Sequence, residues 1–277
     1  MSEALKADYE IGAEIGRGRF GAVFHCYSVT SGEPFAVKTI DKTLLTDSTD
    51  RQLVDREAKI TLLAAAGNPH VVQIYAVYED DSSIHLVLDL LPGPDLFERI
   101  SAVGSPMPEP EAAAIIAQLM EALHACHQRG VAHRDVKPDN VMFDSRGRLR
   151  LVDFGSAECF GEGRPMRGVV GTPYYVAPEV VAGREYGEKV DVWSAGVILY
   201  MMLGGIPPFY GETAVDIFEA VLRGNLRFPT RIFSSVSPAA KDLMRRMICR
   251  DPSRRFSADQ VLRHSWIVGG GGALHLT

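Results

Sequence analysis

The sequence has few of the features that mark secreted, membrane-spanning or nucleic-acid-binding proteins. Residues 1–8 are polar and lack the apolar core of a signal peptide, and no later stretch reaches about 18 uninterrupted apolar residues. Basic residues are also scarce relative to acidic ones, 29 against 35, which gives a formal net charge of −6. This balance offers no electrostatic attraction to nucleic acid or to an anionic membrane. We therefore expect a soluble, cytoplasmic protein with neither as a partner.

Cysteine is too sparse for a disulfide scaffold and too scattered for a structural zinc site. The four cysteines form no close pair, and we expect reduced thiols at Cys26, Cys126, Cys159 and Cys249. Internal repeats are absent, and the only low-complexity tract is the glycine run 269–272. This run predicts a flexible tail over residues 268–277.

What the sequence does contain is ample core material, with 46% hydrophobic residues over 277 positions. The first ninety residues are rich in strand patterns and the rest has mostly helical spacing, which predicts the α+β class. Thr49 and Gln52 fit a capping box that opens a helix to about residue 66, and Pro92 to Pro94 predict a hinge near 90–94. Everything after about residue 111 is expected to be helical apart from short loops. Strands are predicted over residues 9–15, 22–27, 34–40, 71–78 and 84–90.

A glycine-rich pattern, GxGxxGxV, occupies the turn of the first predicted hairpin. Its members are Gly16, Gly18 and Gly21, followed by Val23. Glycine lets a backbone lie close to phosphates because no Cβ holds it away. Alone, the pattern also fits a simple tight turn, whereas a dinucleotide site would need a helix directly after the glycines.

A lysine and a glutamate are expected on inward faces of neighbouring elements. Strand alternation places Lys38 on the face shared by Ala36 and Ile40, where an unpaired ammonium would be costly to bury. Glu57 precedes Ile60 by three residues and falls on the apolar stripe of its helix. These two side chains could pair with each other and with phosphates, although both could instead be solvated and unrelated.

The strongest signal is a catalytic-loop pattern, HRDxKxxN, over residues 133–140, followed by an Asp-Phe-Gly triplet that begins at Asp153. Phosphoryl transfer needs a carboxylate to orient the attacking hydroxyl and oxygen ligands for Mg²⁺. Asp135 suits the first task, and Asn140 and Asp153 suit the second. Lys137 can neutralise charge on the transferred group.

Together these motifs resemble those of eukaryotic protein kinases from Tyr9 to about Ile267. The resemblance implies a two-lobed α+β fold that binds ATP and Mg²⁺ between the lobes. It implies an N-terminal extension at 1–8 and a kinase domain at 9–267, with an N-lobe at 9–90, a hinge at about 89–94 and a C-lobe at 95–267. Lys137 and the segment 171–175 resemble the serine/threonine class, in which Thr172 would form a hydrogen bond near Asp135 and Lys137.

The same resemblance implies roles for further residues. Glu179 of an Ala-Pro-Glu motif should pair with Arg255, and Asp191 should hold the backbone of the catalytic loop. Leu88 matches the gatekeeper, and Asp95 matches a position that meets the ribose. The implied catalytic residues are Asp135, Lys137 and Thr172, and the implied metal ligands are Asn140 and Asp153. The implied nucleotide-binding residues are Ile15, Gly16, Arg17, Gly18, Arg19, Phe20, Gly21, Val23, Ala36, Lys38, Glu57, Leu88, Asp89, Leu91, Asp95 and Met142.

Within the kinases, segments 169–179, 196–200 and 207–209 resemble the calcium- and calmodulin-dependent group, especially the catalytic domains of plant calcium-dependent kinases. No calcium loop of the D-x-D-x-D-G type occurs, so we expect no direct calcium or calmodulin binding. Segments 14–21, 35–42, 153–160 and 225–230 resemble the plant phosphoenolpyruvate carboxylase kinases. That likeness implies a monomeric, calcium-independent enzyme whose substrate is a serine near the N-terminus of phosphoenolpyruvate carboxylase.

The segment between Ser156 and Thr172 contains no serine, threonine or tyrosine, and Gly168 stands where many kinases carry a phosphorylated threonine. Arg134 therefore cannot be organised by a phosphate on this segment, and we expect a kinase that is active as synthesised. Two alternatives remain. One is a calcium-dependent-kinase-like catalytic domain with other substrates. The other is a pseudokinase scaffold, which should lack at least one of Lys38, Asp135, Asn140 and Asp153.

Overall fold

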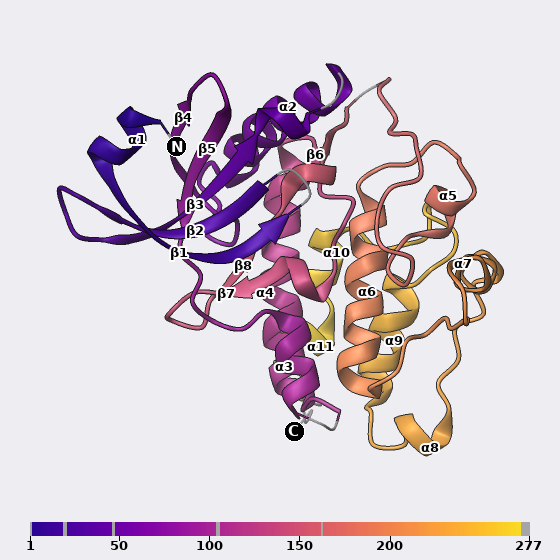
Figure 1. Ribbon diagram of the computed structural model, residues 1–277. Helices are drawn as coiled ribbons and strands as arrows, with labels where there is room; N and C mark the ends of the chain where they lie inside the picture. The colour runs from indigo at the N-terminus through magenta and orange to yellow at the C-terminus, as the bar shows by residue number, and fades with distance from the viewer. Residues whose placement is uncertain (1, 19–20, 46–47, 104–105, 162, 273–277) are drawn as a thin grey trace.

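An antiparallel five-stranded sheet forms the framework of the smaller lobe in a computed structural model that describes residues 2–18, 21–45, 48–103, 106–161 and 163–272 (Figure 1). Its strand order is β1-β2-β3-β5-β4. The predicted start of the fourth strand is wrong, because β4 begins at Ile74 and Val71 forms only an isolated bridge to Leu151. The strands are β1 Tyr9–Gly18, β2 Gly21–Ser28, β3 Pro34–Asp41, β4 Ile74–Glu79 and β5 Ser83–Asp89.

Helix α1 (Glu3–Asp8) packs against this sheet, so most of the expected N-terminal extension is ordered. Leu5 is fully buried in a small cluster with Cys26, Val37 and Val87. The Ser2 hydroxyl accepts a hydrogen bond from the Leu5 backbone N–H and caps the helix. The apolar face of β2, β3 and β5 is thereby covered by the start of the chain.

Helix α2 (Ser48–Ala65) is the main helix of the smaller lobe. It begins at Ser48, and the side chains of the predicted capping box, Thr49 and Gln52, lie outside the described part of the structure. The predicted inward face of this helix is confirmed further along, where Ile60 is buried. The C-terminal half of α2 therefore packs on the rest of the protein through the predicted apolar stripe.

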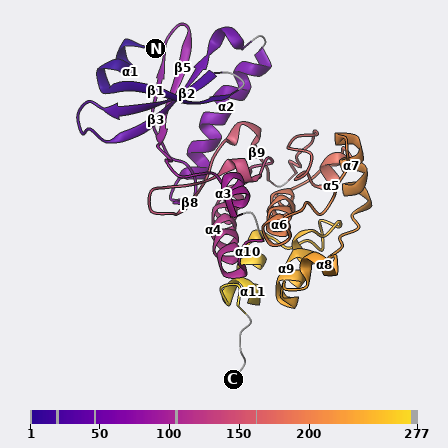
Figure 2. The ribbon, with the colours of Figure 1, turned by 60° about the horizontal axis from the view of Figure 1, so that its bottom comes forward.

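The larger lobe is built around α4 and α6, whose side chains are buried on most sides. Trp193 of α6 is fully buried and stacks on Phe209, with 5.5 Å between the ring centroids. Figure 2 shows these helices set apart from the sheet of the smaller lobe. The helices are α3 Leu96–Val103, α4 Glu109–Gln128, α5 Pro178–Val181, α6 Lys189–Gly204, α7 Ala214–Arg223, α8 Thr230–Phe233, α9 Pro238–Met247, α10 Ala258–Leu262 and α11 Ser265–Val268.

The expectation of helices alone after residue 111 is wrong between α4 and α5. Two antiparallel ribbons occupy this stretch, β6 (Val131–Ala132) with β9 (Glu158–Cys159) and β7 (Val141–Phe143) with β8 (Leu149–Leu151). Strands of two or three residues are too short to show an alternating pattern in a sequence. These ribbons carry the segments that contain the expected catalytic residues.

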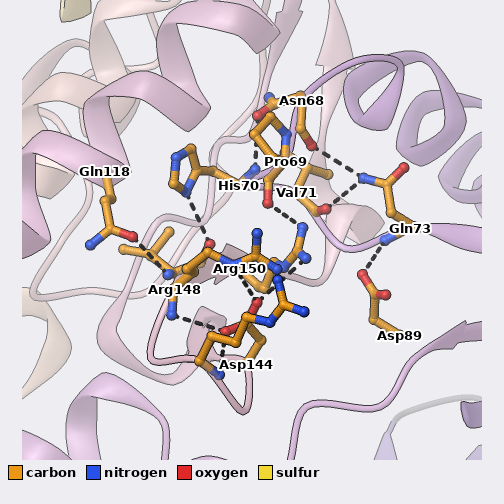
Figure 3. A network of polar contacts seen from close by, with 12 residues as sticks. Asn68, Pro69, His70, Val71, Gln73, Asp89, Gln118, Asp144, Arg148 and Arg150 are labelled. Atoms are coloured by element: carbon orange, nitrogen blue, oxygen red, sulfur yellow. Dashed lines mark hydrogen bonds and ion pairs between the residues drawn. The ribbon is translucent and has the colours of Figure 1, made fainter. Parts of the chain in front are cut away.

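A polar network joins the loop between α2 and β4 to β8 and to the hinge strand β5 (Figure 3). The Arg150 guanidinium donates to the Pro69 carbonyl and pairs with Asp144. Gln73 donates its side-chain amide to the Val71 carbonyl at 2.8 Å, and its backbone N–H donates to the Asp89 carboxylate at 2.9 Å. This network fixes the back of the smaller lobe to the larger one.

The end of the described chain is folded more than the glycine run predicts. Residues 269–272 form a hydrogen-bonded turn, in which the Gly271 N–H donates to the Trp266 carbonyl at 2.9 Å. A Cβ on Gly271 would lie 2.3 Å from the Glu109 carbonyl oxygen, so glycine is required where this turn meets α4. Residues 273–277 of the expected tail lie outside the described part. Within the described ranges, no helix is both long and apolar enough to cross a membrane.

Candidate active site

A cavity of about 340 Å³ opens between the two lobes, walled by β1, β2, β3, α2, the hinge and the ribbon β7–β8. Eleven of the expected nucleotide-binding residues line it: Ile15, Gly16, Arg17, Val23, Ala36, Lys38, Glu57, Leu88, Asp89, Leu91 and Met142. Asp153 also lines it. Sequence reasoning missed Thr61, Val72, Ile74, Leu86, Val152 and Phe154. Most of these are apolar, and nothing in a sequence distinguishes such residues from ordinary core.

Three expected nucleotide-binding residues do not line this cavity. Gly18 and Gly21 face each other across the β1–β2 hairpin. A Cβ on Gly21 would lie only 1.8 Å from the Thr39 carbonyl oxygen, so close packing against β3 already requires glycine there. The Asp95 carboxylate accepts a hydrogen bond from the Glu98 backbone N–H at 2.8 Å, in the first turn of α3. Arg19 and Phe20 lie outside the described residues.

Both carboxylate oxygens of Asp89 accept hydrogen bonds from residues at the start of β4. One carboxylate oxygen accepts from the Gln73 backbone N–H, and the other accepts from the Tyr75 hydroxyl at 2.8 Å. The pKa of Tyr75 is raised to about 12 by burial and by this hydrogen bond to an anion. Asp89 therefore anchors the hinge, and its carboxylate is already engaged away from any ligand.

Lys38 and Glu57 form the expected pair, with 2.5 Å between Nζ and Oε1. Burial lowers the pKa of Lys38, but the charges of Glu57 and Asp153 outweigh it and raise the pKa overall. The ammonium is thus held charged at the inner end of the cavity. The Asp-Phe-Gly turn packs against α2 here, since a Cβ on Gly155 would lie 3.2 Å from Asp153 Oδ1 and 3.5 Å from Glu57 Oε2. Lys38 is thereby paired with Glu57 of the smaller lobe, and its pKa is also raised by the charge of Asp153 from the larger lobe.

The catalytic-loop residues converge on a second cluster. The Thr172 hydroxyl donates to Asp135 Oδ1 at 2.9 Å, and Lys137 Nζ lies 3.0 Å from Asp135 Oδ2 and 3.4 Å from the Thr172 hydroxyl. Asn140 donates its side-chain N–H to the Asp135 carbonyl at 2.9 Å, which leaves the amide oxygen as the atom able to ligate a cation. The contact expected of Thr172 is therefore present.

Asp191 holds the catalytic loop through its backbone. Its two carboxylate oxygens accept from the N–H groups of His133 and Arg134 at 2.9 and 2.8 Å, and from His127 Nε2 at 2.8 Å. Burial raises the pKa of Asp191, but the hydrogen bond to His127 and the charges of His127 and His133 lower it overall. The carboxylate therefore stays ionised although it is fully buried. It stabilises a loop in which Arg134 has φ of 67°, a left-handed conformation that costs free energy for a residue with a side chain.

The residues of both clusters fit a magnesium nucleotide. The cavity is apolar near Ala36 and Met142, where a flat aromatic base could lie, and cationic at Lys38. The part of the chain that the structure describes has no group of three or more His, Cys, Asp or Glu able to hold a metal alone. Mg²⁺ commonly uses one or two protein carboxylates together with phosphate oxygens and water. Asp153 and Asn140 match that arrangement.

A buried ion pair between Arg255 and Glu179 anchors α5, as the resemblance to protein kinases implied. Arg255 makes two parallel hydrogen bonds to Glu179, of 2.6 and 2.9 Å. Both side chains are shielded from water. The chain before α6 is therefore fixed to the segment that precedes α10.

Comparison with known proteins agrees with this geometry. The model of the protein kinase domain family matches residues 9–267. Calcium-dependent protein kinase 21 of Arabidopsis thaliana is 43% identical over 97% of this chain and 50% of its own length. Calcium-dependent protein kinase 19 of the same plant is 44% identical over 98% of this chain and 49% of its own length. Calcium-dependent protein kinase 2 of Zea mays is 41% identical over 98% and 53%.

The chain therefore belongs to the protein kinase family, and the expected two-lobed α+β fold is confirmed. Its similarity to plant calcium-dependent protein kinases confirms the broader group to which the sequence was assigned. The chain spans about half the length of the curated relatives it matches.

Proposed function

We propose that this chain transfers the γ-phosphoryl group of ATP, with Mg²⁺, to serine or threonine hydroxyls of protein substrates. The observation that carries the proposal is the pairing of Lys38 with Glu57 at 2.5 Å beside Asp153. An ammonium paired with Glu57 can orient phosphate oxygens, because it is charged and its position is restrained. A pseudokinase scaffold has no need of this arrangement.

The second cluster supplies the groups for the acceptor. Asp135 Oδ1 or Oδ2 can accept the proton of a substrate hydroxyl and orient its oxygen for attack. Lys137, 3.0 Å from that carboxylate, brings positive charge to the transferred group. Bound Mg²⁺ would neutralise charge on the phosphates, with Asn140 and Asp153 as its protein ligands. The Thr172 hydroxyl fixes the Asp135 carboxylate in place.

For the substrate, we propose a serine near the N-terminus of phosphoenolpyruvate carboxylase, phosphorylated without calcium by a cytoplasmic monomer. The support is the likeness of segments 14–21, 35–42, 153–160 and 225–230 to the plant kinases of that enzyme. The same likeness is what supports calcium independence. The competing proposal is a kinase with the substrates of calcium-dependent relatives, which the identities of 41–44% support.

The deciding experiment is transfer of radiolabelled γ-phosphate from Mg-ATP to purified phosphoenolpyruvate carboxylase, with and without a calcium chelator. A carboxylase variant that lacks the N-terminal serine is the substrate control. The enzyme control is Asp135→Asn, which keeps the size of the side chain and removes the base.

Labelling that survives chelation and disappears with either control would support the full proposal. Labelling of a synthetic serine peptide but not of the carboxylase would overturn the substrate and favour the competing proposal. Labelling that stops on chelation would overturn calcium independence. If no substrate were labelled, the kinase activity itself would be refuted.

A further inference from the structure

Arg134, next to the proposed base Asp135, is surrounded by partners that do not take part in phosphoryl transfer. Its Nε donates to the Ser156 carbonyl at 2.7 Å, and its side chain is only 10% exposed. A guanidinium removed from water to this extent needs an anion close by. The structure provides one from the strand that follows the Asp-Phe-Gly turn.

That anion is Glu158, the first residue of β9. Its backbone position is fixed because Glu158 pairs with Ala132 of β6 across the short ribbon. One carboxylate oxygen lies 3.3 Å from a terminal nitrogen of Arg134, and the other forms an ion pair with Arg56 of α2. Burial and the like charge of Arg134 both lower the pKa of Arg56. Glu158 therefore bridges two arginines from different lobes and offsets part of their combined charge.

Tyr186 extends this contact to the segment before Thr172. Arg134 donates to the Tyr186 hydroxyl at 3.1 Å, and that hydroxyl lies 3.0 Å from the Gly168 carbonyl oxygen, to which it can donate. Tyr186 and Met166 also exchange two backbone hydrogen bonds of 3.0 Å. The Arg134 guanidinium is thus connected to the chain at position 168 without any phosphate.

The location of the contacts made by Glu158, Arg134 and Tyr186 indicates what they do. In kinases activated by phosphorylation, a phosphate orders the activation segment by pairing with arginine, and the helix that bears the glutamate must be in place. The only Ser, Thr or Tyr side chains from 156 to 172 are the two end residues, Ser156 and Thr172. Arg56 is adjacent to Glu57, so an ion pair at Arg56 holds the turn of α2 that presents Glu57 to Lys38.

We propose that Glu158 is a built-in substitute for an activating phosphate, which aligns α2 with the catalytic loop through Arg56 and Arg134, while Tyr186 connects the same network to the segment at Gly168. Glu158 is a positioning residue, since it touches neither of the proposed reacting groups. A phosphoserine or phosphothreonine carries a charge of about −1.5 to −2, against −1 for the carboxylate. The β6–β9 pairing compensates by fixing where the smaller charge lies. The inference rests on the proposed kinase activity and is independent of the choice of substrate.

The test compares the parent chain with Glu158→Gln, Arg56→Gln and the double variant, using a synthetic serine peptide. We expect kcat of Glu158→Gln to fall about tenfold, equivalent to roughly 1.4 kcal/mol of activation free energy. The double variant should lose no more than Glu158→Gln alone, because Arg56 then has no partner left to lose. The matched control is Glu121→Gln, whose half-exposed carboxylate pairs with His70 at 3.0 Å, and this variant should leave kcat unchanged.

A second readout requires no substrate. In Glu158→Gln and in Tyr186→Phe, which removes only the hydroxyl, amide hydrogen exchange over residues 166–170 should be faster than in the parent. This distinguishes failure of the network from failure of the proposed kinase activity, because exchange can be followed even if the parent labels nothing. Melting temperatures identify a variant that fails to fold, and Tyr186→Phe then still provides the exchange measurement.

Three results would overturn the inference. The first is a Glu158→Gln enzyme with kcat within twofold of the parent. The second is multiplication of the Glu158→Gln and Arg56→Gln losses in the double variant, which would show that the two residues act separately. The third is exchange over 166–170 that is the same in the parent and in Tyr186→Phe.

Discussion

Replacing Arg255 with alanine tests how far a buried ion pair stabilises the larger lobe. The guanidinium is fully shielded and makes four hydrogen bonds: two to Glu179, one from Nε to the Cys249 carbonyl at 2.9 Å and one to the Lys189 carbonyl at 3.1 Å. It also lies over the Trp193 ring, 5.1 Å from the centroid. The Arg255→Ala change removes all of these contacts and leaves Glu179 buried without a counter-charge.

The expected magnitude follows from that uncompensated carboxylate. Removing one partner of a buried ion pair costs about 3–5 kcal/mol. One kcal/mol shifts the melting temperature of a chain of this size by roughly 2–4 °C. We therefore expect the melting temperature of Arg255→Ala to fall by about 10 °C.

Differential scanning fluorimetry measures this shift, and two variants provide the comparison. Arg223→Ala breaks an exposed ion pair with Glu219 and should change the melting temperature by about 1 °C or less. A double variant, Glu179→Leu with Arg255→Met, removes both charges and should recover part of the loss. Equal shifts for Arg255→Ala and Arg223→Ala would refute the reasoning, because burial of the pair would then have no energetic consequence.

Three further predictions follow from the contacts described above. Asp191→Asn should lower kcat on a serine peptide by about tenfold or more, because the amide keeps one acceptor oxygen and turns its NH2 group toward a backbone N–H from which Asp191 now accepts; an unchanged kcat would argue against a role in holding the loop. Leu5→Ala should destabilise the smaller lobe by about 2–5 kcal/mol in chemical denaturation, as for other fully buried leucines; a loss below about 0.5 kcal/mol would show that α1 is dispensable. Brief iodoacetamide treatment should label exposed Cys159 and spare Cys26 and Cys126, since burial raises their pKa values to about 11 and 12; mass spectrometry showing early labelling of either buried thiol would contradict this.

The sequence was sufficient where local rules decide the structure. Strand alternation placed Lys38 and Ala36 on the face that lines the cavity, and helical spacing placed Glu57 opposite them. The contacts of Thr172, Asp191 and Glu179 followed from motif resemblance and are present in the structure. In each case the residue has a charge or hydroxyl that is costly to bury without a partner.

Other features depend on contacts between distant parts of the chain, which no local pattern encodes. Glu158 and Arg56 are separated by about a hundred positions, and the two-residue strand that orients Glu158 shows no periodicity. Leu5 is part of a polar N-terminal segment, and its burial depends on the shape of the sheet beneath it. The hydrogen bonds that Asp89 accepts from Gln73 and Tyr75 likewise form only once β4 lies beside β5.

Two adjacent residues of α2 hold this helix in one orientation relative to the cavity and the catalytic loop. Glu57 pairs with Lys38 of the sheet, and Arg56 pairs with Glu158 of the other lobe. Successive residues on a helix point about 100° apart, so the two ion pairs fix the rotation of α2 as well as its distance from the cavity. A rotation of the helix that broke one pair would strain the other. The orientation of Glu57 at the inner end of the cavity is therefore coupled, through the adjacent residue Arg56, to the charge of Glu158 beside the catalytic loop.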